Sequence, residues 1–168
     1  KRIINVSPQE TAVAPNLTVR ENLELIAEIY GFEKEMAVQK AQNMIDDFEF
    51  AEVAKSKAKT LSGGWQRRLS IAMALISEPK ILFLDEPTLG LDVIARHSLW
   101  GEIEKLKGKI TVILTTHYLE EAVALCDRIG IMAHGEFVAE GTSDELVALS
   151  GEKDFESAFV KLTNGGAL

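Results

Sequence analysis

The stretch Ile81-Leu82-Phe83-Leu84-Asp85-Glu86-Pro87 joins four consecutive apolar residues to two acids and a proline. A short run that is apolar at every position predicts a central strand of a parallel sheet, because such strands are covered on both faces. Ligands of open parallel sheets gather at the carboxyl ends of the strands. Asp85 and Glu86 are therefore candidates for chemistry. One carboxylate can hold a hydrated Mg²⁺ and the other can orient an attacking water.

Helical and strand patterns alternate around this stretch and predict an α/β fold. The expected strands, besides Ile81–Leu84, are Lys1–Val6, Ile110–Leu114, Arg128–Met132 and Glu136–Glu140, the last two joined by a hairpin turn at 133–135. Three helices are expected in the first half: one from the Thr18 cap to Gly31, one over Glu33–Asp47, and one that starts near Ser62 and ends at Pro79. Four more follow: Val93–Lys107, Tyr118–Asp127 and two near the C-terminus, the first of which is capped by Thr142.

The composition is that of a globular protein and excludes several classes. Of the 168 residues 46% are hydrophobic and 26% are charged, and the net charge is −8. An acidic balance argues against a protein whose main partner is the nucleic-acid backbone. The longest apolar runs fall far short of the roughly 18 residues that a membrane span needs. The single cysteine, Cys126, cannot form an internal disulfide and is expected in the core with Leu119, Ala122 and Val123.

A second candidate site begins the helix after Leu61-Ser62-Gly63-Gly64. Two glycines let another molecule approach the backbone, and the unpaired N–H groups of a first helical turn attract anions. The alternative is an ordinary serine cap with a flexible glycine pair. Arg67 and Arg68 follow and could add positive charge to this site, but we expect them on an exposed helix face.

Two further polar residues are expected at the same edge of the sheet as Asp85. His117 follows Ile110–Leu114, which is predicted to be a second buried strand, and its imidazole can donate to a phosphate oxygen. Gln9 follows the first strand after Ser7-Pro8. Each residue taken alone is also compatible with an ordinary hydrogen-bonded surface side chain.

The motifs together resemble the ATP-binding domains of ABC transporters. Five segments are similar to that family's Q-loop, signature motif, Walker B, D-loop and H-loop, in that order: Ser7–Gln9, Leu61–Gly64, Ile81–Pro87, Leu89–Asp92 and Thr116-His117. The stretch Leu17–Tyr30 looks most like the exporter branch. Trp65 departs from the family's usual polar residue after the glycine pair. The implied fold is a partial P-loop NTPase (RecA-like) parallel sheet with an inserted α-helical subdomain at about 15–78, the core being 1–14 and 79–168.

The resemblance implies a role for each site residue. Glu86 is the general base, and Asp85 holds Mg²⁺ through water. His117 contacts the γ-phosphate of ATP. Gln9 reaches Mg²⁺ and the attacking water.

The remaining implied roles concern a second subunit. Ser62, Gly63 and Gly64 hold the γ-phosphate of ATP on the opposite subunit of a head-to-tail dimer, and Asp92 links the two composite sites.

The family's P-loop pattern, G-x-x-x-x-G-K-[ST], is not found in these 168 residues. The one Gly-Lys pair, Gly108-Lys109, is followed by Ile110. Because the family carries this motif before the Q-loop, we expect the chain to be an N-terminally truncated cassette. The family's topology then predicts a sheet that is open between the strands Ile110–Leu114 and Arg128–Met132.

The implied function is ATP hydrolysis that powers transport. The implied partners are a transmembrane permease and a second ATP-binding domain, and the implied location is the cytoplasmic face of a membrane. Two alternatives remain open at this point: an ABC-type ATPase acting on nucleic acid or ribosomes, and a catalytically silent regulatory module. The presence of Glu86 and His117 argues against a catalytically silent module.

The 168-residue polypeptide by itself is expected to bind ATP poorly, because it carries no P-loop to hold the phosphates. It is also expected to associate, because the open sheet would expose two apolar edges. Isothermal calorimetry with Mg-ATP tests this expectation. Low-micromolar binding to a monomer would contradict it.

Overall fold

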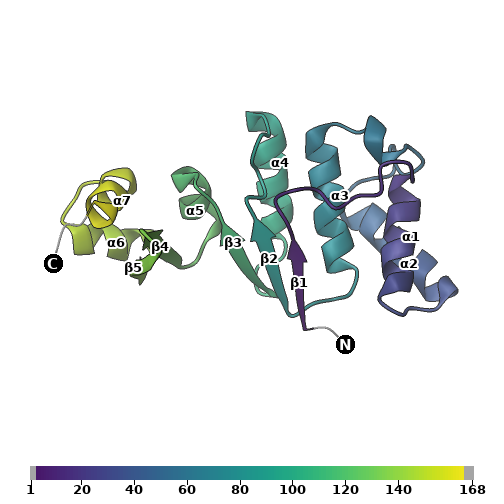
Figure 1. Ribbon diagram of the computed structural model, residues 1–168, viewed down its shortest axis with the longest axis horizontal. Coiled ribbons are helices and arrows are strands. Elements are labelled where there is room, and N and C mark those ends of the chain that lie inside the picture. Colours follow the sequence, from purple (N-terminus) through teal and green to yellow (C-terminus); the bar gives the residue numbers. More distant parts are fainter. Residues whose placement is uncertain (1–2, 165–168) are drawn as a thin grey trace. The chain divides into compact units, whose positions relative to one another are not determined.

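The computed structural model describes residues 3–164, which form two compact units that divide between Thr115 and Thr116 (Figure 1). The first unit contains the elements β1 (Ile4–Ser7), α1 (Val19–Ile29), α2 (Lys34–Asp47), η1 (Ala58–Thr60), α3 (Gly63–Leu75), β2 (Ile81–Asp85), α4 (Val93–Glu104) and β3 (Thr111–Thr115). The second contains α5 (Leu119–Leu125), β4 (Ile129–Ala133), β5 (Glu136–Gly141), α6 (Ser143–Ser150) and α7 (Phe155–Thr163). The α/β class is confirmed. The predicted strand Lys1–Val6 falls partly on residues 1 and 2, outside the described part.

A three-stranded parallel sheet forms the centre of the first unit, in the order β1-β2-β3. Ser7 pairs with Leu84, and Asp85 pairs with Thr115. Helix α3 packs on one face, where Leu82 and Leu84 are fully buried. On that face the Asn5 side chain donates to the carbonyl of Ala74 at 2.7 Å. Strand β2 is therefore the central strand that the sequence predicts.

The helices α1 and α2 pack against each other before the sheet resumes. The predicted capping box is present: the Thr18 hydroxyl accepts from the Glu21 N–H, and the Glu21 carboxylate accepts from the Thr18 N–H at 2.7 Å. That backbone hydrogen bond lowers the pKa of Glu21 below its usual value. Gly31, with φ +89°, follows the end of α1, where a left-handed residue is expected.

The second unit has its own small core. It is formed by Ala122, Ile129, Ile131, Ala139, Leu146 and Leu162, with Cys126, Phe155 and Phe159 packed against it. The hairpin turn at His134 and Gly135, which have φ +52° and +81°, joins the antiparallel strands β4 and β5 as predicted. Thr142 and Glu145 form a second capping box. Among the described residues β4 pairs only with β5, in a two-stranded sheet, and the predicted opening beside β3 stays a prediction.

Two predictions about the second half are wrong. Strand β3 is not buried, since Thr111, Ile113 and Thr115 are exposed; within the described sheet it pairs only with β2 and is an edge strand. Val123 is also exposed, because α5 turns Ala122 and Leu125 to the core and the next residue after Ala122 points about 100° away from it.

Three helices are shorter than predicted. Helix α3 ends at Leu75, four residues before the predicted end. Helix α4 ends at Glu104, after which turns lead to Gly108 at φ +75°. Helix α5 ends at Leu125, because Cys126 already has the extended conformation that leads into β4. None of the described helices is both long and apolar enough to cross a membrane.

Leu84→Ala is expected to lower the free energy of unfolding by about 2–5 kcal/mol, because Leu84 is fully buried under α3 and its truncation leaves a cavity. Urea unfolding measures this loss. The matched control is Ile94→Ala on α4: the residue is 83% exposed, and the change is expected to stay within about 0.5 kcal/mol. Equal losses in the two variants would contradict the assigned face of β2.

Candidate functional site

The carboxyl ends of the three parallel strands bring the predicted acids and glutamine to one edge of the first unit. Pro8 and Gln9 follow β1, Asp85 is the last residue of β2, and Thr115 is the last residue of β3. Gln9 and Asp85 are exposed, whereas Glu86 is half-buried. The predicted meeting of Gln9, Asp85 and Glu86 at one sheet edge is therefore present in the structure.

Thr115 fixes both acids from the neighbouring strand. Its hydroxyl donates to Oδ1 of Asp85 at 2.5 Å, and its carbonyl accepts the N–H of Glu86 at 3.0 Å. Glu86 has a left-handed backbone with φ +46°. A non-glycine residue in that region costs about 1–3 kcal/mol and persists where its surroundings impose it. The position of the Glu86 side chain is thus set by the fold and not by local preference.

Arg67 on α3 is 4% exposed and points its guanidinium to this edge, so the expectation of an exposed arginine is wrong. All three of its nitrogens donate to backbone carbonyls. Nε donates to Pro87 at 2.9 Å, Nη2 to Asp85 at 2.5 Å, and Nη1 to Pro8 and to Gln9, the latter at 3.2 Å. One side chain therefore connects the signature helix to the residues after β1 and to both neighbours of Glu86.

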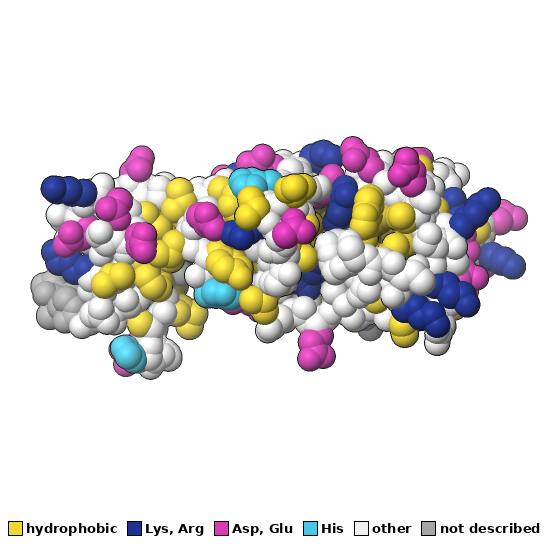
Figure 2. Space-filling model, turned by 90° about the horizontal axis from the view of Figure 1, so that it is seen from above, with side chains coloured by type: hydrophobic (Ala, Val, Ile, Leu, Met, Phe, Trp, Pro, Cys, Tyr) yellow, Lys and Arg dark blue, Asp and Glu magenta, His cyan; other side chains and the backbone are white. Residues whose placement is uncertain are grey.

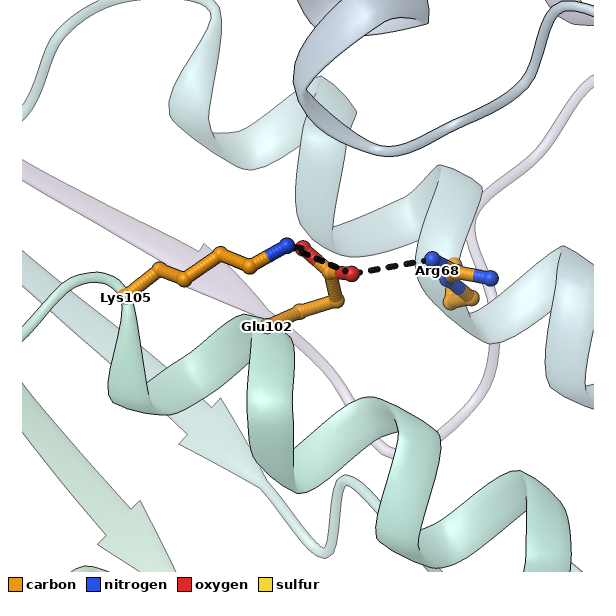
Figure 3. A network of polar contacts seen from close by, with 3 residues as sticks. All are labelled: Arg68, Glu102 and Lys105. Carbon is orange, nitrogen blue, oxygen red and sulfur yellow. Dashed lines mark hydrogen bonds and ion pairs between the residues drawn. The ribbon is translucent and has the colours of Figure 1, made fainter.

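Arg68 is buried as well, by a different set of contacts (Figure 3). Its Nη2 lies 3.0 Å from Oε1 of Glu102 on α4, and Nζ of Lys105 lies 3.1 Å from Oε2 of the same carboxylate. Its guanidinium carbon lies 4.6 Å from the ring centre of Trp65. Arg68 thereby connects α3 to α4. The prediction of an exposed Arg68 is therefore wrong as well.

The signature segment begins α3 as predicted. Ser62 is the N-cap residue, but its side chain makes no capping hydrogen bond, and Gly63 and Gly64 are the first two helical residues. Trp65 does not disturb this start; it packs against Phe50 with ring centres 5.7 Å apart. The first turn therefore leaves N–H groups and the Ser62 hydroxyl available for an anion.

A hollow of about 590 Å³ places this segment beside the D-loop residue Asp92. Ser62, Gly64 and Trp65 line it from α3, and Asp92, Val93 and Ile94 line it from the start of α4. The Asp92 carboxylate accepts the N–H of Ala95 at 2.8 Å, so it is the N-cap of α4. The structure thus brings Asp92 to the signature segment and gives its side chain a structural role.

His117 belongs to the second unit, two residues beyond Thr115 in the sequence. It is exposed, and its ring lies 4.2 Å from that of Tyr118, centre to centre. That His117 lies at the same sheet edge as Asp85 and Glu86 stays a prediction.

The donors at the sheet edge fit a magnesium ion carried by a nucleotide. Asp85 and Gln9 offer oxygen ligands, which Mg²⁺ prefers. Within residues 3–164 no group of three or more His, Cys, Asp or Glu side chains forms a dedicated metal cage. Mg²⁺ commonly takes one or two carboxylates and fills the rest of its octahedron with water and phosphate oxygens. Asp85 is thus suited to that limited contribution.

Comparison with known proteins decides the family. The family model for ABC transporters matches residues 1–89, more than half of the chain. The chain belongs to the ABC transporter family. It is 40% identical over 152 residues to the linearmycin resistance ATP-binding protein LnrL of Bacillus subtilis, covering 90% of this chain and 49% of that protein. It is 42% identical over 149 residues to the daunorubicin resistance ATP-binding protein DrrA3 of Streptomyces coeruleorubidus, covering 88% of this chain and 47% of that one.

A solved structure supports the same fold assignment. The ATP binding subunit of an ABC transporter superposes with a TM-score of 0.80 at 28% sequence identity, covering 96% of this chain and 69% of the other. The predicted partial P-loop NTPase fold of an ABC cassette is confirmed. The chain spans about half the length of the curated relatives named above.

Sequence reasoning missed the part that two residues, Arg67 and Thr115, have at this sheet edge. Nothing in the local pattern marks Arg67, because its acceptors are backbone carbonyls of segments some 20 and 60 residues away. Thr115 carried a weak signal, since it ends a strand next to β2 and a hydroxyl there can reach the last residue of its neighbour.

The two signature glycines are expected to respond differently to a methyl group. A Cβ on Gly63 meets nothing within 4 Å, whereas one on Gly64 would lie 3.2 Å from the Cβ of Ala95. Gly63→Ala should therefore keep or raise the stability by up to about 1 kcal/mol, since alanine favours helix over glycine. Gly64→Ala should raise the stability less, or lower it, because its methyl group would press on Ala95. Thermal unfolding of the two variants measures the difference, and a greater loss in Gly63→Ala would refute the assigned geometry.

Proposed function

We propose that this chain is part of an ATP-hydrolysing subunit of an ABC transporter and powers movement of a substrate across a membrane. The observation that carries the proposal is the placement of Glu86. It lies directly after Asp85 at the carboxyl edge of a parallel sheet, and its backbone is fixed by Thr115 and Arg67. A carboxylate held at such an edge is suited to orient a water for attack on a phosphate.

Each of the predicted catalytic and metal-binding residues has a part in the proposed hydrolysis. Glu86 accepts a proton from the attacking water, and Gln9 orients that water with its amide. Asp85 would hold the hydrated cation that accompanies the nucleotide. His117 donates to the γ-phosphate. Mg²⁺, when bound, neutralises the charge that develops on the transferred phosphoryl group.

The hollow beside Ser62 and Gly64 is proposed as the contact with ATP held by a second ATP-binding domain. The exposed start of α3 offers N–H donors for the γ-phosphate. Asp92, at the start of α4, lines the same hollow and would link this contact to the other composite site. This arrangement requires a head-to-tail dimer, in which each chain completes the site of its partner.

A transmembrane partner is proposed for the helical subdomain at about 15–78, with the chain at the cytoplasmic face of the membrane. Hydrophobic side chains on α1 and α2 are exposed, among them Ile29 at 66% and Met36 at 50%. The relatives are named as linearmycin and daunorubicin resistance ATP-binding proteins, and on that basis we propose an exporter.

The charge distribution favours transport over action on nucleic acid. The chain carries 26 acidic and 18 basic residues. On the face in Figure 2, acidic, basic and hydrophobic side chains are interspersed. A nucleic-acid surface instead gathers Lys and Arg on one face.

Glu86→Gln tests the proposed hydrolysis in the full-length protein. The amide keeps the shape of the side chain but cannot take the proton, so kcat is expected to fall by about 10²–10⁴-fold. Nucleotide binding is expected to change little. Phosphate release and the binding of a fluorescent ATP analogue are the two measurements.

The matched control for this change is Glu78→Gln. Glu78 is exposed, pairs with Lys40 at 2.5 Å and lies outside the site, so the rate is expected to be retained. A wild-type protein without Mg²⁺-dependent hydrolysis, or a Glu86→Gln variant at full rate, would refute the proposal. Stimulation of the wild type by RNA, and not by membrane partners, would support the nucleic-acid alternative.

A further inference from the structure

We infer that Arg67 is a positioning residue for ATP hydrolysis, holding Gln9 and Glu86 in fixed register with the helix that begins at the signature glycines. The inference rests on the proposed function for its kinetic part. Arg67 donates to backbone carbonyls around the residues that are proposed to contact nucleotide and water, and it acts through that backbone.

The geometry of the guanidinium carries the argument. A guanidinium offers five N–H donors in a rigid planar fork. In Arg67 the three nitrogens that bear them each donate to carbonyls, and the acceptors come from two strand ends: Pro8 and Gln9 after β1, Asp85 and Pro87 around the end of β2. A planar donor set with acceptors on several sides fixes their mutual distances, so neither strand end can shift without breaking a buried hydrogen bond.

The two acceptors on β2 bracket the proposed base. The carbonyls of Asp85 and Pro87 belong to the residues directly before and after Glu86, and both accept from Arg67. On the other side, the N–H of Glu86 donates to Thr115. The left-handed backbone of Glu86 is thereby held from two elements, α3 and β3. Loss of the α3 contact would let this residue relax to a commoner conformation and move its carboxylate.

The location of Arg67 on α3 couples the signature segment to the two strand ends. Arg67 lies one helical turn after Gly63, on the same helix whose first turn is proposed to meet the partner's ATP. A displacement of that first turn on nucleotide contact would be carried by the guanidinium to Gln9 and to Glu86 together. The chain therefore contains a direct link between the signature segment and the hydrolytic edge.

The kinetic test compares Arg67→Met with Arg67→Lys in the full-length protein. Methionine retains an aliphatic stem and removes every donor, so kcat is expected to fall by about 10²-fold, the effect of a misplacement near 1 Å. The nucleotide dissociation constant and KM should stay within about 3-fold, since an interaction needed only in the transition state lowers kcat. Lysine keeps the charge but supplies one nitrogen, so its kcat should lie between those of the wild type and Arg67→Met.

The matched control is Asn22→Ala on α1. Asn22 is 1% exposed and donates to the carbonyls of Ala14, Leu17 and Thr18, so it is also a buried side chain that holds several backbone groups, but it touches neither strand end. This variant is expected to lower the melting temperature and keep kcat within about 3-fold. An equal loss of kcat in Asn22→Ala and Arg67→Met would make Arg67 a structural residue only and overturn the inference.

Hydrogen exchange tests whether the hydrogen bonds of Arg67 fix the strand ends, and it does not depend on activity. In Arg67→Lys, which also serves if Arg67→Met fails to fold, amide exchange over 85–91 should rise by about 10-fold while exchange in α2 is unchanged. Unchanged exchange at 85–91 together with wild-type kcat would overturn the inference. If the wild-type protein does not hydrolyse ATP, the proposed function fails, and the exchange result still decides whether Arg67 fixes these segments.

Discussion

A buried guanidinium is the constraint on which the arrangement of the first unit depends. Burying Arg67 is costly unless its donors are satisfied, because a charged group loses its hydration on transfer to the interior. The carbonyls that satisfy it come from the ends of β1 and β2, so the helix α3 and the two strand ends must be assembled together. The same hydrogen bonds that stabilise Arg67 in the interior define the geometry around Glu86.

Helix α3 joins the two halves of the proposed site because its consecutive arginines point to different places. Arg67 reaches the strand ends, whereas Arg68 reaches Glu102 on α4 and lies over Trp65. The first turn of the same helix presents Ser62 and the glycines to the hollow shared with Asp92. In the proposed function this helix has two contacts that matter: its first turn is the signature segment, and its Arg67 donates to backbone carbonyls on both sides of Glu86.

Sequence patterns predicted the elements well where their signal was local. The capping boxes at Thr18 and Thr142, the hairpin at His134-Gly135 and the buried strand Ile81–Leu84 follow from side chains that act within a few residues of each other. Predictions failed where the outcome depended on distant neighbours. Strand β3 has the apolar content of a buried strand but lies at an edge of the described sheet, and adjacent arginines on a helix gave no sign of burial.

The sequence by itself determined the α/β class, the order of the motifs and the edge of the sheet to which Gln9, Asp85 and Glu86 belong, because parallel strands present their carboxyl ends at one edge whatever their exact packing. Only the tertiary structure decided what holds those residues in place. Arg67 and Thr115 act on them through backbone groups, which every residue possesses. A backbone carbonyl carries no identity in the sequence, so its partner becomes visible only when the chain has folded.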